Sequence, residues 1–339
     1  MTQEGLRHTG ERALSVILTA FNRRQFLRES LRSAVQQSLP AHRYEVLVLA
    51  NFELSDSDLP VGANNVRVFY ENSPKVGQTL ARGLREATGR VVTFLDDDDL
   101  YQPDRLARVL GFFERHGDLG YYHNAFSLFT EEPRGTAGTP RRTPSDPVIG
   151  TFRPGSSQNP GCADAASLLR FLSAGSLERN LSSAAISRAL GLAIAPSVAR
   201  VEGLTDTFLL FAALSSPGVL AFDSVPLTMV RRHPSNTSKS RRDLAKRRSA
   251  WEVIEEVVHG SDPNPTLDRY LRLREARSVI FDHLVGQPAS RRELWLATET
   301  VLRSAPYSGP RKALIYSALG MASAVPIPGI GAAVPLVMG

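Results

Sequence analysis

Four consecutive carboxylates, Asp96 to Asp99, follow an apolar, β-prone run that begins at Val91. A run of this kind, preceded by Gly89 and followed by Pro103, is typical of a buried strand that ends in a turn before a helix. Adjacent carboxylates repel each other, so they are tolerated on an exposed loop or beside a cation that neutralises them. Carboxylate oxygens suit Mg²⁺ and Mn²⁺. The run therefore predicts either a divalent-cation site or a solvated acidic turn.

The segments around the acidic run alternate between strand and helix patterns. Strands are expected at Leu14–Ala20, Tyr44–Ala50, Val66–Tyr70 and from Val91, and helices at residues 24–37, 78–87 and 103–116. Strands that alternate with helices indicate a mostly parallel sheet with helices on both faces. In such sheets ligands bind beyond the carboxyl ends of the strands, which is where the acidic run lies.

The second half of the chain has a less regular pattern. Further elements are expected at residues 119–129, 164–173, 180–190, 205–214, 219–222 and 227–231, with helices across 243–303 interrupted at 260–265 and 286–288. Residues 130–163 are rich in Pro, Gly, Ser, Thr and Arg and predict a flexible surface insertion. We therefore divide the chain into a domain at 1–240, a helical extension at 241–305 and a tail at 306–339.

Composition narrows the class of protein. The 339 residues are 42% hydrophobic and 22% charged, with a net charge of +6, which fits a globular protein with an anionic partner. The basic cluster at 231–248 has few interleaved aromatic residues, so nucleic acid is not an expected partner. Residues 1–12 are polar, and Cys162 is the one cysteine, so we expect no secretory signal, no internal disulfide and a cytoplasmic location.

The end of the chain, residues 313–339, contains no charged residue. Its unbroken apolar part, 313–325, is shorter than the ~20 residues that a spanning helix needs. Arg311 and Lys312 precede it, where they can meet anionic lipid. We interpret the tail as a segment that docks at the cytoplasmic face of a membrane, packs on the protein, or binds a partner.

Three stretches of this sequence, residues 14–23, 77–82 and 94–103, resemble the inverting family 2 glycosyltransferases of GT-A fold. The resemblance covers about residues 13–235. It implies a Rossmann-like, mostly parallel sheet flanked by helices, and a transferase of the hexosyltransferase type. Such an enzyme moves a sugar from a nucleotide-diphosphate donor, UDP-sugar by default, to a glycan hydroxyl or a lipid-linked phosphate.

The resemblance assigns the acidic run to the family's DXD motif. Mapped in this way, Asp97 is the residue on the ribose or diphosphate side and Asp98 is the metal ligand. Asp96 is a second donor-side candidate, and Asp99 can substitute or assist, so the register is ambiguous by one position. His233 follows the last core strand and completes the metal site for Mg²⁺ or Mn²⁺ or touches the diphosphate; alternatively, it is an exposed turn residue before a proline.

Other donor-binding residues follow from the same resemblance. Thr19, Ala20 and Asn22 lie in the loop that lines the nucleobase; Asn22 can also cap the helix that follows it, and the two roles can coexist. Arg82 lies near base and phosphate, or is an ordinary surface residue. The family usually has Asp at the position of Asn51, which keeps the hydrogen-bonding capacity but not the charge and so leaves the base undetermined.

An inverting transfer requires a general base that deprotonates the acceptor hydroxyl. The family supplies a carboxylate at the start of a helix, and Asp206 occupies that position before an apolar run. Its alternative role is to interact with the helix dipole. Glu202 is the second candidate for the base.

Two other functions are consistent with parts of the pattern. A sugar-phosphate nucleotidyltransferase also combines a nucleotide fold with a metal carboxylate, but its Gly-rich loop after the first strand is not matched by residues 19–23. A non-catalytic nucleotide- or glycan-binding protein with a degenerate site is the other alternative, because Asn51 replaces the usual Asp.

Overall fold

The computed structural model describes residues 12–73, 75–130, 180–233, 243–260, 265–284 and 289–303. Its strands are β1 Leu14–Ala20, β2 Tyr44–Ala50, β3 Val66–Tyr70, β4 Val91–Asp96, β5 Leu100–Tyr101, β6 Leu119–Thr130, β7 Ala184–Ser187 and β8 Val219–Arg232. Its α-helices are α1 Leu27–Val35, α2 Val76–Glu86, α3 Arg105–Arg115, α5 Arg188–Val198, α6 Thr205–Leu214, α7 Asp243–His259, α8 Pro265–Leu284 and α9 Arg291–Arg303.

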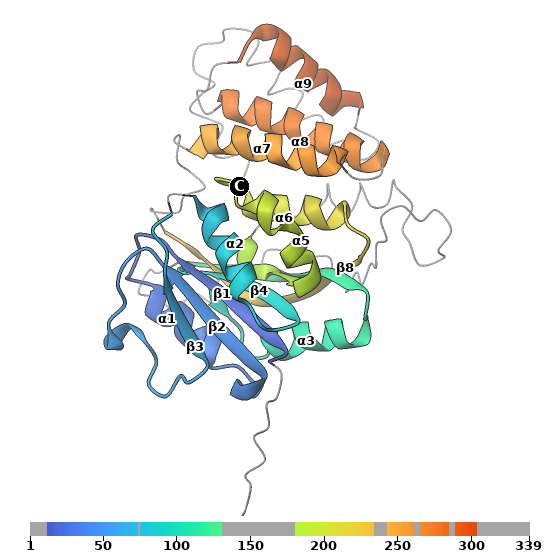
Figure 1. The fold of residues 1–339 in the computed structure, drawn as a ribbon. Coiled ribbons are helices and arrows are strands. Elements are labelled where there is room, and N and C mark those ends of the chain that lie inside the picture. The colour runs from blue at the N-terminus through green and yellow to red at the C-terminus, as the bar shows by residue number, and fades with distance from the viewer. Residues whose placement is uncertain are drawn as a thin grey trace, which may run out of the picture.

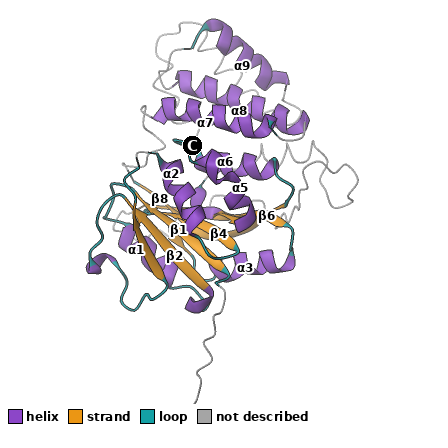
Figure 2. Cartoon of the chain, in the orientation of Figure 1, coloured by secondary structure: helices purple, strands orange, loops and turns teal. Residues whose placement is uncertain are grey.

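The strands form one eight-stranded sheet in the order β3-β2-β1-β4-β7-β6-β8-β5 (Figure 2). The first four are parallel, and Leu14 of β1 pairs with Tyr44 of β2 and Val91 of β4. Strand β7 runs antiparallel to both of its neighbours, and β5 antiparallel to β8. Six strands therefore run in one direction and two in the other, which confirms the prediction of a mostly parallel sheet flanked by helices.

Both faces of the sheet are covered by helices because its central strands are apolar throughout. Helices α1 and α3 pack on one face, and α2, α5 and α6 on the other (Figure 1). Helices α7 and α8 add to the second layer: the rings of Trp251 and Tyr270 lie 6.0 and 5.4 Å from that of Phe211 in α6. Helices α7 and α8 therefore share a core with the sheet domain, whereas α9 packs in a separate cluster with α8.

Gly77 sets how closely α2 approaches α5. A Cβ atom on Gly77 would lie 1.9 Å from the carbonyl oxygen of Val198 and 2.4 Å from that of Val201. The main-chain N–H of Gly77 donates to that Val201 oxygen at 3.1 Å. Glycine at this position therefore permits direct contact between two backbones.

Three expectations differ from the structure. The two strands expected at 219–222 and 227–231 are one strand, β8, because register shifts near Asp223 and Pro226 interrupt the pairing with β6 without ending it. Helix α1 begins at Leu27, so the expectation that Asn22 caps it is wrong. Helix α5 continues to Val198, whereas the element expected from the sequence ended at residue 190.

Some expectations fall outside the described residues. These are most of the insertion at 130–163, the helix at 164–173 and the tail at 306–339. Within the described ranges, each helix is too short or too polar to cross a membrane.

Candidate active site

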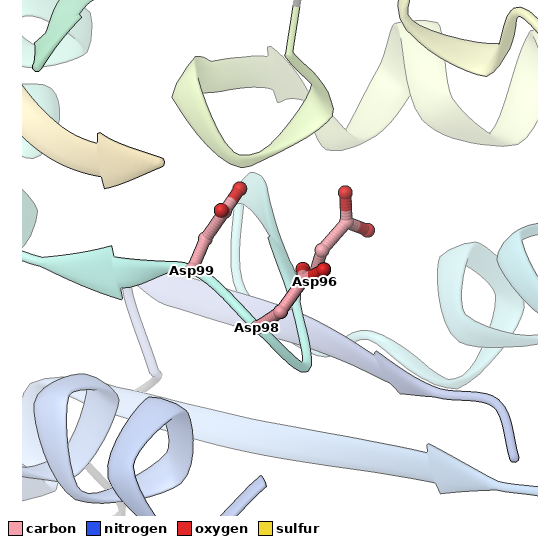
Figure 3. A group of neighbouring side chains, drawn as sticks. All are labelled: Asp96, Asp98 and Asp99. Carbon is pink, nitrogen blue, oxygen red and sulfur yellow. The ribbon is translucent and has the colours of Figure 1, made fainter. Parts of the chain in front are cut away.

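The acidic run forms a tight turn at the carboxyl end of β4. The main-chain N–H of Asp99 donates to the carbonyl oxygen of Asp96 at 3.2 Å, which closes the turn. Carboxylate oxygens of Asp96, Asp98 and Asp99 all lie within 4.8 Å of one another. Their side chains leave the turn toward the same side (Figure 3). We refer to these three residues as the carboxylate triad.

Two members of the triad are fixed by the segment at 180–183. The hydroxyl of Ser182 lies 2.7 Å from Oδ2 of Asp99, to which it donates, and 3.0 Å from the main-chain N–H of Asp96, from which it accepts. Thr19, in β1, donates its hydroxyl to Oδ1 of Asp96 at 3.3 Å. The main-chain N–H of Arg231 donates to Oδ1 of Asp99 at 3.1 Å. Neighbouring strands therefore set the orientation of these carboxylates.

Asp97 points away from the triad toward the loop after β1. Its Oδ2 accepts from the main-chain N–H of Phe21 at 3.1 Å, and its Oδ1 accepts from Nη2 of Arg23 at 2.5 Å. Its carbonyl oxygen accepts from the hydroxyl of Ser30 in α1. The side chain of Asp97 thus holds the loop after β1 against the acidic turn.

Asp98 contacts two residues that lie far apart in the sequence. Its Oδ2 accepts from Nη1 of Arg23 at 2.6 Å and lies 3.0 Å from Nε2 of His233, just after β8. The imidazole of His233 is buried beside the ring of Phe26, at 4.9 Å between centroids. His233 is therefore not an exposed turn residue. It lies beside Asp98, the other residue that the resemblance assigns to the metal site.

Arg231 packs against the main chain of the acidic turn. Its side chain is buried, donates from Nε to the carbonyl oxygen of Asp98 at 2.9 Å and pairs with Glu29 at 2.6 Å. The guanidinium also lies over the rings of Phe26 and Phe129. Because its guanidinium is enclosed in this way, Arg231 stabilises the acidic turn and does not line an exposed phosphate site.

The negative charge of the acidic run exceeds the positive charge of the side chains around it. Burial, followed by repulsion from Asp98 and Asp97, raises the pKa of Asp96 to about 7. Burial also raises the pKa of Asp97 to about 6, although Arg23 opposes the increase. The pKa of Asp99 is raised well above its ordinary value by burial and then by Asp96 and Asp98. A bound divalent cation would relieve this excess.

The donor atoms around the cluster fit a divalent cation. Three carboxylates and one imidazole are ligands that Mg²⁺ and Mn²⁺ accept, with Mn²⁺ the more tolerant of nitrogen. Asp98 and His233 already lie side by side, and Asp96 and Asp99 contribute oxygens within 4.8 Å of that of Asp98. The residues therefore fit the expected metal.

The ends of β1 and β2 are joined by a pair of asparagines. Asn22 has a positive φ of 57°, and its main-chain N–H donates to Oδ1 of Asn51 at 2.8 Å. Nδ2 of Asn51 donates back to Oδ1 of Asn22 at 2.8 Å. The main-chain N–H of Asn51 also donates to the carbonyl oxygen of Ala20. These residues therefore form one hydrogen-bonded rim beside the acidic turn.

Asp206 lies in the first turn of α6, half-buried. Its Oδ2 accepts from the main-chain N–H of Asn180 at 3.0 Å, and its Oδ1 from that of Thr207 at 2.7 Å. Its charge contributes to the raised pKa of Asp96, so it lies near that carboxylate. Glu202, the second candidate base, forms an ion pair with Lys75 at 2.6 Å.

Arg82 lies in α2, and its side chain reaches the end of β3. Its Nη1 donates to the carbonyl oxygen of Tyr70 at 2.7 Å and to Glu71 at 3.0 Å. Its guanidinium lies over the ring of Phe69 at 5.3 Å. These contacts hold Arg82 at the rim, on the same edge of the sheet as the asparagine pair.

The structure thus brings together Thr19 and the acidic run, with Asp206 and His233 on either side. The resemblance placed Ser182 in a segment that lines the sugar or acceptor side and gave Arg231 positive charge for phosphates, but it predicted neither contact with the acidic turn and gave Arg23 no role. Arg23 lies directly after the loop that the sequence singled out, and that position was the available signal for it. Ser182 and Arg231 carry no local signal, because their contacts with Asp99 cross 83 and 132 positions of the chain.

Comparison with known proteins gives matches to glycosyltransferases. Residues 15–177 match the profile of the family described as Glycosyl transferase family 2. An uncharacterized glycosyltransferase of Rickettsia conorii is 27% identical over 124 residues, which are 35% of this chain and 20% of that protein. The putative teichuronic acid biosynthesis glycosyltransferase TuaG of Bacillus subtilis is 25% identical over 137 residues, 38% of this chain and 50% of TuaG. The aligned stretches span less than two thirds of either relative.

Two solved structures share the architecture. S. aureus TarS 1–349 in complex with UDP-GlcNAc superposes with a TM-score of 0.56 at 16% identity, covering 91% of both chains. The mannosyltransferase PcManGT from Pyrobaculum calidifontis, in complex with GDP-Man and Mn²⁺, superposes with a TM-score of 0.50 at 14% identity, covering 93% of this chain and 88% of that one. These similarities show the GT-A fold and confirm the predicted fold class.

Proposed function

We propose that the protein is an inverting, divalent-metal-dependent glycosyltransferase, because residues 15–177 match the family 2 glycosyltransferase profile and the chain has the GT-A fold. It moves a sugar from a nucleotide-diphosphate donor, by default a UDP-sugar, to a hydroxyl or lipid-phosphate acceptor. The observation that carries the proposal is the carboxylate triad, Asp96, Asp98 and Asp99, beside His233 at the carboxyl ends of the strands. TarS in complex with UDP-GlcNAc and PcManGT in complex with GDP-Man and Mn²⁺ support a nucleotide-sugar donor and a metal.

In this proposal Asp98 and His233 hold Mg²⁺ or Mn²⁺. When bound, the metal supplies positive charge to the diphosphate leaving group. Asp96 is the donor-side carboxylate of the triad, and its oxygens accept hydrogen bonds from the ribose. Asp97 acts indirectly, because both of its oxygens already hold the loop after β1. This assignment selects one register among the four acids.

The rim at the ends of β1 and β2 binds the nucleobase in the same proposal. Thr19 and Ala20 end β1, and Asn22 and Asn51 close the rim by their paired amides. Arg82 of α2, whose side chain reaches the end of β3, contributes positive charge on the side of the base and phosphate. Polar main-chain and amide groups of this kind fix the orientation of a flat base.

Asp206 is the proposed general base. A carboxylate oxygen of Asp206 takes the proton of the acceptor hydroxyl while the acceptor oxygen attacks the anomeric carbon from the side opposite the leaving diphosphate. The bond to the diphosphate breaks as the new glycosidic bond forms, which inverts the configuration. The ion pair with Lys75 makes Glu202 the weaker candidate.

A peripheral position at the cytoplasmic face of a membrane is the proposed location, with a glycan or a lipid-linked acceptor. Helix α9 exposes Trp295, Leu296 and Leu302 to solvent. Arg311 and Lys312 follow in the sequence, before the uncharged tail. Apolar side chains with nearby basic residues favour attachment to an anionic lipid surface.

A thermal-shift screen with UDP, GDP, CDP and ADP, each with Mn²⁺, Mg²⁺ or EDTA, tests the proposal. A ligand at 100 times its Kd stabilises a protein by about 2.7 kcal/mol. We expect metal-dependent stabilisation by one nucleotide, followed by transfer from the corresponding donor. Asp98→Asn should remove the metal-dependent part while the protein stays folded. Unchanged donor hydrolysis and transfer in folded Asp98→Asn protein would refute the proposal.

A further inference from the structure

The side chain of Arg23 occupies the position of a cation in the acidic turn. Its Nη1 lies 2.6 Å from Oδ2 of Asp98 and 3.5 Å from Nε2 of His233. Its Nη2 lies 2.5 Å from Oδ1 of Asp97. One guanidinium therefore pairs with two of the four acids and contacts both residues proposed to hold the metal.

The contacts of Arg23 involve the same atoms that a metal would use. Mg²⁺ binds its oxygen ligands at about 2.0–2.1 Å, closer than the guanidinium lies to Oδ2 of Asp98. A divalent ion bonded to Asp98 and His233 would therefore lie within a few ångströms of Nη1. Like charges at this separation repel strongly, and more so where burial keeps water away.

We propose that Arg23 is an internal counter-cation that competes with the divalent ion for Asp98 and His233. The ion enters as the guanidinium withdraws, and the guanidinium returns when the ion leaves. This inference rests on the proposed metal-dependent function and adds a regulation of the same site. It gives Arg23 a positioning role toward the metal ligands, which the family resemblance did not assign.

The surroundings of Arg23 allow this exchange. Its side chain is 23% exposed, while the side chains of Asp97 and Asp98 are 1% and 8% exposed, so the guanidinium is the member of this cluster with a route to solvent. Asp97 lies outside the carboxylate triad and stays available as a partner after Asp98 is released. Arg23 can thus leave the metal ligands without losing every ion pair.

The test measures metal affinity in the absence of any nucleotide. Mn²⁺ binding to the full-length protein is followed by the electron paramagnetic resonance signal of free Mn²⁺, for wild type, Arg23→Gln, Arg23→Lys and Arg24→Gln. Arg24 is the matched control, because it carries the same charge one residue away but pairs with Asp58 at 3.1 Å. Melting temperatures in EDTA and in Mn²⁺ supply a second readout.

Removal of the competitor should tighten Mn²⁺ binding. We expect the Kd of Arg23→Gln to fall by about tenfold, that of Arg23→Lys to change less, and that of Arg24→Gln to stay within about twofold of wild type. In EDTA the melting temperature of Arg23→Gln should be lower than that of wild type, and its increase on addition of Mn²⁺ should be larger.

Equal or weaker Mn²⁺ binding by Arg23→Gln than by wild type would overturn the competition, because Arg23 would then support the site or act only on the loop. Mn²⁺ binding by none of these proteins would overturn the competition, because no ion would then reach Asp98 and His233 without the donor. Donor binding is assayed separately with the nucleotides, so a failure of the competition is distinguishable from a failure of the transferase proposal.

Discussion

Asn22 and Asn51 bind each other through two hydrogen bonds of 2.8 Å, one in each direction, at the ends of β1 and β2. The first uses the main-chain N–H of Asn22, whose φ of 57° turns the chain toward the acidic run. Asn51 is therefore a structural partner of the loop that contains Arg23. The departure from the family's usual Asp does not by itself indicate a degenerate site.

The first prediction concerns this pair. Asn51→Ala removes both hydrogen bonds and should lower the free energy of unfolding by about 1 kcal/mol, measured by urea denaturation. Asn51→Asp should cost less, because a carboxylate still accepts from the main-chain N–H of Asn22 and the Asn22 amide can rotate to donate to it. Asn51→Ala protein as stable as wild type would show that the pair does not hold the loop.

The second prediction concerns the proposed base. Asp206→Asn should lower the transfer rate by about 10²–10⁴-fold, because the amide cannot take the proton of the acceptor hydroxyl. Its Kd for the nucleotide should not change, since Asp206 is not proposed to bind the donor. Glu202→Gln is the matched control, and its effect should be small. Single-turnover transfer assays at saturating donor measure the rates; loss of less than about tenfold in Asp206→Asn would exclude it as the base.

The sheet could be predicted from the sequence because its central strands are continuous apolar runs. Strands β1, β2, β3 and β4 were predicted within a residue or so, as was their parallel arrangement. These strands are buried or paired along their whole length, so local pattern and tertiary environment agree. Because ligands bind beyond the carboxyl ends of parallel strands, the position of the acidic run after β4 was enough to predict the location of the candidate active site.

The register within the acidic run could not be predicted. All four residues are Asp, and only the turn closed by Asp99 and Asp96 decides that Asp97 points to the other side. Helix α1 begins at Leu27 rather than near residue 23 because the loop before it is held by Asn51 and Asp97, which are distant in sequence. Such contacts leave no periodic signal in the chain.

The third prediction tests the packing of α2 on α5. Gly77→Ala should lower the free energy of unfolding by about 1–3 kcal/mol, because its Cβ would overlap the carbonyl oxygens of Val198 and Val201. Gly117→Ala is the control, since a Cβ there meets nothing within 4 Å. Urea denaturation of both variants gives the comparison. Equal stability of the two would mean that α2 can shift away from α5 at little cost.

The fourth prediction concerns α9 and the tail. Binding to phosphatidylglycerol vesicles, measured by co-sedimentation, should weaken by about tenfold in the double variant Trp295→Ser and Leu302→Ser, because both side chains are exposed and apolar. Deletion of residues 306–339 should also move the protein toward the soluble fraction. Leu192→Ser, an exposed apolar position on α5, should bind as wild type does. Unchanged sedimentation of all variants would exclude membrane docking through this region.

The fifth prediction is a pH dependence of stability in EDTA. The pKa of Asp96 is about 7 and that of Asp97 about 6 in the folded protein, whereas an unfolded Asp has a pKa of about 3.9. The folded state therefore binds more protons between about pH 4 and pH 7, and its free energy of unfolding falls as pH rises through that window. The melting temperature should be higher at about pH 5.5 than at about pH 7.5, and Asp96→Asn should reduce the difference. Mn²⁺ at about pH 7.5 should restore stability, because the ion takes over the neutralising role of the protons. A melting temperature in EDTA that rises between these two pH values would contradict the excess of negative charge in the acidic turn.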